Sequence, residues 1–170
     1  MTLHWLPAAD RADLMADPVA RAIGQVEGAR VAQIDPDLAD TAAFCERYGV
    51  AMADSANCVV VAARRGGEVR YAACMVLATT RADVNGVVRR HLGARKASFA
   101  PMDEAVELTG MEYGGITPVG LPADWPILVD TQVAERAEVV IGSGVRRSKL
   151  AVAGAALAAL KGAEVLSLAT

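Results

Sequence analysis

The stretch Gly114-Gly115-Ile116-Thr117-Pro118-Val119-Gly120 is the part of the sequence around which the rest of the fold can be worked out. Its three glycines and one proline exclude a regular helix or a central strand. Glycine permits a positive φ or a close backbone approach, and proline fixes φ, so this glycine loop has a defined shape. A tight structural turn and a loop whose free amides bind a ligand are both compatible with the composition.

The segments on either side of the glycine loop predict a helix before it and a buried strand after it. Pro101-Met102-Asp103-Glu104 is typical of a first helical turn, with proline early and acids at the positive end of the helix. Thr109-Gly110 predicts the end of that helix, with glycine just after its last turn. The apolar run Ile127-Leu128-Val129, which ends on Asp130, predicts the strand.

The bulk properties indicate one cytosolic domain. A chain of 170 residues is long enough for a single core, and 54% of its residues are hydrophobic but only 4% aromatic. No apolar run approaches the roughly 18 residues of a membrane span, and we expect no signal peptide and no membrane partner. The three cysteines, Cys45, Cys58 and Cys74, form no C-x-x-C pair, which favours a reducing compartment. The chain has only two histidines, His4 and His91, which makes a metal site improbable. We expect no cofactor.

The charge of the chain is unevenly distributed, although its net value is only −3. Residues 1–63 hold nine acids and four bases. Residues 64–96 hold two acids and eight bases: Arg64, Arg65, Arg70, Arg81, Arg89, Arg90, Arg95 and Lys96. Arg146, Arg147 and Lys149 form a second basic cluster. These charges are compatible with weak binding of a polyanion, or with solvated surface side chains alone.

The order of the expected elements predicts a mixed α/β fold with a mixed sheet. We expect an amphipathic helix over residues 5–24, its second part beginning after Asp17-Pro18, and a helix from Asp35-Pro36 to Tyr48 that buries Cys45. His91 is expected at a helix end and Asp83 as a helix cap. The expected strands are 31–34, 58–63 and 69–79 joined by a hairpin turn, 96–99, 127–129, 138–141, 148–152 and 165–168, with short helices after Asp130 and over 154–160.

Four separated motifs together resemble the YbaK/EbsC-type aminoacyl-tRNA editing domain: Leu108-Thr109-Gly110, the glycine loop, Leu128-Val129-Asp130 and Gly142-Ser143-Gly144. The family loop typically reads G-G-I-x-P-x-G after an L-T-G helix end. The resemblance covers residues 37–168 and leaves residues 1–36 as an N-terminal extension of a single domain. It implies a mixed, barrel-like sheet surrounded by helices, with the ligand pocket at the glycine loop.

The resemblance also implies an activity, the hydrolysis of the ester between a wrong amino acid and the 3′-adenosine of a tRNA. The implied partners are a weakly bound mischarged tRNA, with an aminoacyl-tRNA synthetase or a second copy of the chain as further candidates. The implied catalytic groups are the oxyanion-binding amides of Gly114, Gly115 and Ile116, and we expect Asn57 to act with them by orienting the ribose or the attacking water. The implied substrate-binding residues are Thr117, Pro118, Gly120, Asp130, Gly142, Ser143 and Gly144, with Asp130 either a pocket group or a structural support.

One position departs from the family pattern. Family deacylases usually carry a lysine at the start of the first hairpin strand, thought to bind the phosphate or ribose of the terminal adenosine, where this chain reads Asn57-Cys58-Val59. Asparagine can form hydrogen bonds but brings no charge. The chain is then either a deacylase without that lysine or a protein that binds the aminoacyl end without turnover, and hydrolysis of another small ester is a third alternative. We interpret Cys58 as a core thiol rather than a nucleophile, and we expect Gly115→Ala to lower activity more than stability.

Overall fold

The strands of the computed structural model, which describes residues 2–170, form two sheets. The first has the order β1-β2-β8-β7, with all pairs antiparallel, and consists of Leu6–Pro7, Arg30–Gln33, Ser148–Val152 and Val139–Gly142. The second has the order β5-β3-β4-β6-β9 and consists of Lys96–Phe99, Ala56–Arg65, Glu68–Leu77, Ile127–Asp130 and Ala163–Leu166. Its pairs are antiparallel between β5, β3 and β4 and parallel between β4, β6 and β9, so the predicted mixed α/β fold is confirmed.

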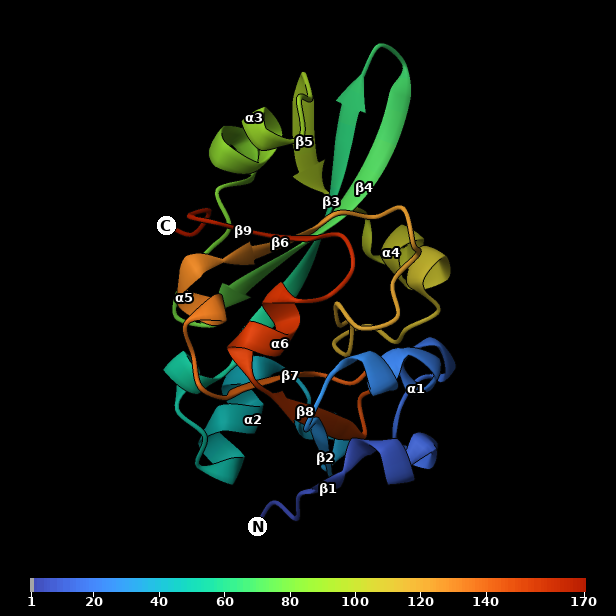
Figure 1. Ribbon diagram of the computed structural model, residues 1–170, viewed down its shortest axis with the longest axis vertical. Coiled ribbons are helices and arrows are strands. Elements are labelled where there is room, and N and C mark those ends of the chain that lie inside the picture. The colour runs from blue at the N-terminus through green and yellow to red at the C-terminus, as the bar shows by residue number, and fades with distance from the viewer. Residues whose placement is uncertain (1) are drawn as a thin grey trace.

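The two sheets meet at the start of β3, where a parallel bridge joins Ser55 to Val140 of β7. Over residues 2–170 the sheets do not close into a barrel, which corrects the barrel-like detail of the expectation. In Figure 1 the first sheet lies at the base of the molecule with the N-terminus, and the β3–β4 hairpin extends from the opposite end. The cavity described below lies beside the junction, because both β3 and the first sheet contribute to its lining.

Short helices connect and cover the strands. The α-helices are α1 (Asp17–Ala22), α2 (Thr41–Tyr48), α3 (Arg89–His91), α4 (Met102–Thr109), α5 (Thr131–Ala134) and α6 (Gly154–Ala158). A π-helical turn over Val84–Val88 leads into α3, and 3₁₀ turns occupy Ala8–Asp10, Ala12–Leu14, Ile23–Gln25, Pro36–Leu38 and Met52–Asp54. No helix within residues 2–170 has the length and apolar character needed to span a membrane.

Several local predictions are confirmed by the backbone. Gly110 ends α4 with φ 69°, and the Gly66-Gly67 turn joins β3 to β4 with both φ values positive. The carboxylate of Asp83 accepts hydrogen bonds from the amides of Gly86 and Val87, as expected of a cap. Cys45 is buried beside Phe44 on the inner side of α2.

Other local predictions are wrong. Of the helix expected over residues 5–24, only α1 is α-helical, and β1 and two 3₁₀ turns precede it. The helix does not extend further back because the amide of Ala16 donates to the carbonyl oxygen of Ser143. The helix expected from Asp35 to Tyr48 is interrupted at residues 39–40, and Asp35 caps only the first turn. The last strand lies two residues earlier than expected, because the amides of Leu168 and Ala169 turn to Asp130.

Residues 2–36, which belong to the expected N-terminal extension, pack into the same fold as the rest of the chain. β2 pairs with β8 inside the first sheet, and a side chain added at Gly120 would meet the backbone of Pro18 at 2.4 Å. A side chain at Gly144 would likewise meet the Cβ atom of Ala16 at 2.5 Å. The N-terminal segment therefore packs against the glycine loop at Gly120 and against the second glycine motif at Gly144.

Candidate functional site

A cavity of about 470 Å³ lies between the two sheets and contains part of the predicted site. Its wall consists of β3 at residues 56–60, the chain entering α2 at residues 39–41, α4 with the residues before it, and the glycine loop. Gly142 at the end of β7 and Lys149 near the start of β8 complete it. Of the predicted site residues, the cavity brings together four: Asn57, Gly114, Ile116 and Gly142.

The backbone of the glycine loop packs directly against the backbone of the second glycine motif, Gly142-Ser143-Gly144. This contact leaves no room for a side chain at Gly115 or Gly142. A Cβ atom at Gly115 would lie 2.9 Å from the backbone of Val145, and one at Gly142 would lie 2.6 Å from the carbonyl oxygen of Gly115. The amide of Gly144 donates to that same oxygen at 2.6 Å. The two motifs thus form one packed unit at the wall of the cavity.

The amide of Gly115 is not free, which corrects its assignment as an oxyanion donor. It donates to the carbonyl oxygen of Glu112 at 2.9 Å. The amides of Gly114 and Ile116 donate to no acceptor within residues 2–170, and both residues line the cavity. Two of the three expected donors therefore have no acceptor in the described part of the chain.

The other predicted substrate-binding residues of the two motifs lie behind the cavity wall. Thr117 is fully buried, and its hydroxyl oxygen has no hydrogen-bond partner within residues 2–170. Pro118 and Gly120 line a separate cavity of about 140 Å³. The buried hydroxyl of Ser143 donates to backbone carbonyl oxygens, and Gly144 packs against α1. Their contacts shape the loop and do not reach the main cavity.

Asp130 is a structural support rather than a lining group of the cavity. Its side chain is buried, and its carboxylate accepts hydrogen bonds from the amides of Gln132, Leu168 and Ala169. It therefore begins α5 and fixes the C-terminal segment beside β6. Of the two alternatives left open by the sequence, these contacts favour the structural one.

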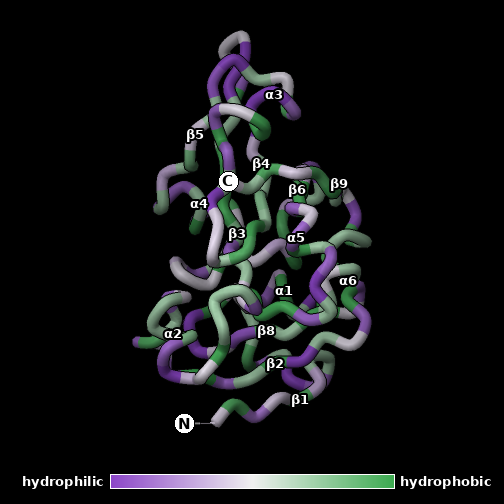
Figure 2. The backbone as a smooth tube through the Cα atoms, turned by 90° about the vertical axis from the view of Figure 1, so that its left-hand side faces the viewer, coloured by the Kyte–Doolittle hydropathy of each residue, from purple (hydrophilic) through white to green (hydrophobic). Residues whose placement is uncertain are grey.

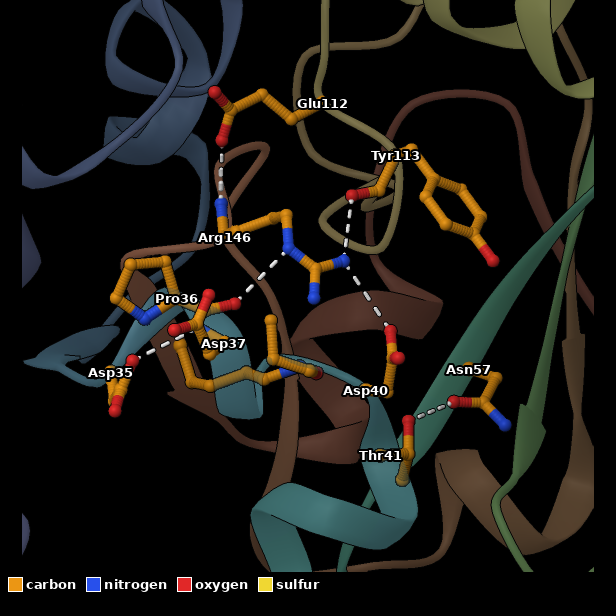
Figure 3. A network of polar contacts seen from close by, with 11 residues as sticks. Asp35, Pro36, Asp37, Asp40, Thr41, Asn57, Glu112, Tyr113 and Arg146 are labelled. Carbon is orange, nitrogen blue, oxygen red and sulfur yellow. Dashed lines mark hydrogen bonds and ion pairs between the residues drawn. The ribbon is translucent and has the colours of Figure 1, made fainter.

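Asn57 faces the start of α2. Its Oδ1 atom accepts a hydrogen bond from the hydroxyl of Thr41 at 2.7 Å, and both residues line the cavity. Figure 3 shows this pair, with the Arg146 network beyond Asp40. Asn57 is therefore held from the α2 side.

Cys58 also lines the cavity, on the opposite face of β3 from Asn57. Its side chain packs against the main hydrophobic core, as does Ile116, whereas its neighbour Val59 packs against the second core. Burial, with Cys74 nearby, raises the pKa of the Cys58 thiol far above its usual value. A thiol kept protonated in this way is a poor nucleophile, which agrees with the interpretation of Cys58 as a core residue.

Arg146 connects two residues of the cavity wall, Asp40 and Tyr113. Its guanidinium donates to the carbonyl oxygens of Pro36 and Tyr113 and pairs with the Asp40 carboxylate at 3.3 Å, as drawn in Figure 3. Its backbone amide donates to Glu112 at 2.7 Å. This network ties the entry of α2 to the glycine loop and neutralises the exposed Asp40.

Lys149 is a lining residue that the sequence placed only in a basic surface cluster. It is 7% exposed, and its ammonium group donates to the carbonyl oxygen of Ala39 at 2.7 Å. The ammonium nitrogen lies 5.3 Å from the centre of the Phe44 ring. Burial lowers the pKa of Lys149 to about 8. The signal that could have found it is a charged residue inside a short apolar strand, Ser148–Val152.

Four of the basic residues of 64–96 gather at the far end of the β3–β4 hairpin. Arg64, Arg65, Arg95 and Lys96 line one shallow surface there, and none of them forms an ion pair in the part of the chain that the structure describes. Figure 2 shows this end of the hairpin, near α3, as strongly hydrophilic. His91 pairs with Glu164 at 2.8 Å at the end of α3, as expected for a residue at a helix terminus. The β3 strand connects this basic hairpin end to the cavity.

The described residues show no metal centre. Within residues 2–170, no group of three or more histidine, cysteine, aspartate and glutamate side chains is arranged to hold a metal ion. The residues of the cavity wall carry one amide side chain, hydroxyl groups, one thiol, the carboxylate of Asp40 and the buried ammonium group of Lys149.

Comparison with known proteins adds a family model and solved structures. The model of the aminoacyl-tRNA editing domain matches residues 35–160. A structure described as a "putative trans-editing enzyme for prolyl tRNA synthetase" is 24% identical, with a TM-score of 0.74 over 97% of this chain and 98% of that one. A structure of the hypothetical protein APE2540 is 25% identical, with a TM-score of 0.74 over 84% of this chain and 91% of that one.

Proposed function

This chain belongs to the aminoacyl-tRNA editing domain family, and from this premise we propose that it is a trans-editing deacylase of mischarged tRNA. The observation that carries the proposal is the cavity lined by Gly114 and Ile116, whose amides have no acceptor within residues 2–170. Hydrogen-bond donors that are already fixed in place stabilise the negative oxygen of an acyl-transfer intermediate without reorganisation. The structure described as a "putative trans-editing enzyme for prolyl tRNA synthetase" shares this fold over nearly the whole of both chains, which is compatible with the proposal.

The proposed reaction needs no group beyond the ester, water and the cavity wall. The water oxygen forms a bond to the ester carbonyl carbon, one proton leaves to solvent, and the carbonyl oxygen takes the negative charge. When the carbonyl re-forms, the bond to the ribose oxygen breaks and that oxygen takes up a proton. The products are the free amino acid and a tRNA with a free terminal hydroxyl. The main contribution of the protein is orientation of an already activated ester and stabilisation of the oxyanion.

Selection of the amino acid would take place on the apolar side of the cavity. Val60, Ala105 and Ile116 belong to one hydrophobic cluster there, and Met102 and Phe99 lie at its exposed edge. A pocket of this kind separates substrates by size, with one methylene worth about 1–3 kcal/mol. We therefore propose that the edited amino acid has a small apolar side chain.

The basic hairpin end is the proposed contact with the tRNA backbone. Its cations lack acidic partners within residues 2–170 and lie on the strand that leads to the cavity. Phosphate contacts of this kind give affinity that falls steeply with salt concentration. The acidic net charge of −3 agrees with weak rather than strong binding.

The test is a deacylation screen against a panel of mischarged tRNAs, beginning with tRNA for proline carrying small apolar amino acids. We expect release of the amino acid from at least one member at a rate well above spontaneous hydrolysis. Binding of a mischarged tRNA without release from any member would favour the binding-only alternative. That alternative draws its support from Asn57, which brings no charge to the position of the family lysine.

A further inference from the structure

Lys149 brings a cation into the cavity that forms no ion pair with any residue of 2–170. It is the second residue of β8 and lies between Ala32 of β2 and Gly142 of β7. Directly opposed residues of neighbouring strands place their side chains on the same face, and both of these neighbours are small. The lysine chain therefore has room to run along this face to the carbonyl oxygen of Ala39 and the ring of Phe44.

The hydrogen bonds of the Lys149 ammonium group are only partly used. It has three protons to donate, and one goes to the carbonyl oxygen of Ala39, which itself lines the cavity. The ring of Phe44 covers another side of the ammonium group. Asp40, the nearest acid in sequence to that carbonyl, is exposed and is paired with Arg146 instead. A buried cation without a counter-charge is unfavourable unless a ligand completes its surroundings.

The cavity wall offers several donors to a negatively charged oxygen, with one carboxylate, Asp40, at its exposed rim. Gly114 and Ile116 line the cavity and have amides without an acceptor within residues 2–170, and Lys149 brings a positive charge from the first sheet. Asn57 at the remaining side is neutral. We propose that the Lys149 ammonium group binds the oxygen on which negative charge develops when water adds to the aminoacyl ester. This inference rests on the proposed deacylase function and names the group that carries the positive charge in its site.

The depth of Lys149 favours the ester oxygen over a tRNA phosphate. The rim residues Asp40, Tyr113 and Gly114 are exposed, whereas Lys149 is 7% exposed. The aminoacyl ester is the last group of the tRNA and enters a cavity first, while the phosphates continue into the nucleic acid outside. In a site with little water, a fixed charge acts more strongly on the developing oxyanion than it would at the surface. Lys149 keeps its own proton throughout the reaction described above.

The kinetic test compares Lys149→Met and Lys149→Gln with Lys161→Met, in which an exposed lysine is replaced in the same way. Two substrates are used: the mischarged tRNA that the parent hydrolyses, and the same amino acid esterified to adenosine without phosphate. We expect kcat to fall by a factor on the order of 10² to 10³ for both substrates in the Lys149 variants. An unchanged kcat, or a higher KM confined to the tRNA, would overturn the inference, the second result by assigning Lys149 to a phosphate.

A binding measurement separates this inference from the proposed function. The probes are an adenosine aminoalkylphosphonate, which carries the negative charge of the intermediate, and the uncharged amide-linked aminoacyl adenosine. We expect Lys149→Met to weaken binding of the phosphonate at least tenfold and to leave binding of the amide unchanged, whether or not the parent shows turnover. Equal affinity of parent and variant for the phosphonate overturns the inference, whereas a parent without turnover on any aminoacyl-tRNA overturns only the deacylase.

Discussion

Replacing Lys149 by methionine should stabilise the protein, because the lysine is a buried cation without an acidic partner in the described chain. Burial lowers its pKa from 10.5 to about 8, so the charged form is disfavoured in the fold by roughly 3 kcal/mol. The variant loses the hydrogen bond to Ala39, which is worth about 1.5 kcal/mol. The expected net gain is about 2 kcal/mol at pH 7, or roughly 4–8 °C in Tm for a chain of this length.

The gain should depend on pH in a defined direction. Between pH 8 and pH 10.5 the unfolded chain, with its lysine near the ordinary pKa, binds more protons than the folded chain. The parent therefore gains stability as the pH rises through this window, and the advantage of Lys149→Met becomes smaller. The groups that face Lys149 are Asp40 and Cys45, which raise its pKa, and Arg146, which lowers it. None of these three is changed in the variant.

Urea denaturation of the parent, Lys149→Met and Lys161→Met at pH 7 and pH 9.5 measures both effects. Lys161 is exposed, so its replacement should change the free energy of unfolding by less than about 0.5 kcal/mol. A Lys149→Met variant less stable than the parent at pH 7 would refute the reasoning, since the ammonium group would then be stabilising the fold. An advantage that grows with pH would refute the assigned direction of the pKa.

Three further predictions concern other parts of the site. Gly115→Ala should lower the free energy of unfolding by about 1–3 kcal/mol, because its Cβ atom would meet the backbone of Val145, and an unchanged urea midpoint would contradict that packing. The double variant Arg64→Glu with Arg65→Glu should weaken tRNA binding. It should also reduce the slope of log affinity against log salt concentration by about 0.7 to 0.9 per lost phosphate contact. If filter binding gives the same slope for the variant as for the parent, the hairpin is not part of the interface. Cys58 should react with iodoacetamide slowly at pH 8, and peptide mass spectrometry showing the rate of a free thiol would be inconsistent with its raised pKa.

Features that depend on a few neighbouring residues could be predicted from the sequence. The helix end at Gly110, the cap at Asp83 and the Gly66-Gly67 hairpin turn all follow from local backbone chemistry. The position of the glycine loop at a cavity followed from the family resemblance and four separated motifs. Residues 5–24 could not be predicted in the same way, because their 3₁₀ turns depend on contacts with Ser143 and the glycine segments far along the chain.

Within the site, the sequence could not show which backbone groups are already used. Gly114, Gly115 and Ile116 are equivalent as donors in the sequence, yet only the amide of Gly115 is bound, to Glu112. Our expectation that Gly115→Ala would act mainly on activity is replaced by an effect on stability for the same reason. The depth of Lys149 likewise depends on small neighbours in two other strands, which no local pattern shows.

The central claim, that mischarged tRNA is deacylated in this cavity, is tested most directly by filling the cavity. Ala100 lines it and is half-buried, so Ala100→Leu would project three more carbon atoms toward the substrate, while Ala155→Leu on the exposed side of α6 is the matched control. Release of the amino acid from mischarged tRNA should fall at least tenfold in Ala100→Leu and remain at the parent rate in Ala155→Leu. Hydrolysis by Ala100→Leu at the parent rate, with the variant folded, would contradict the claim.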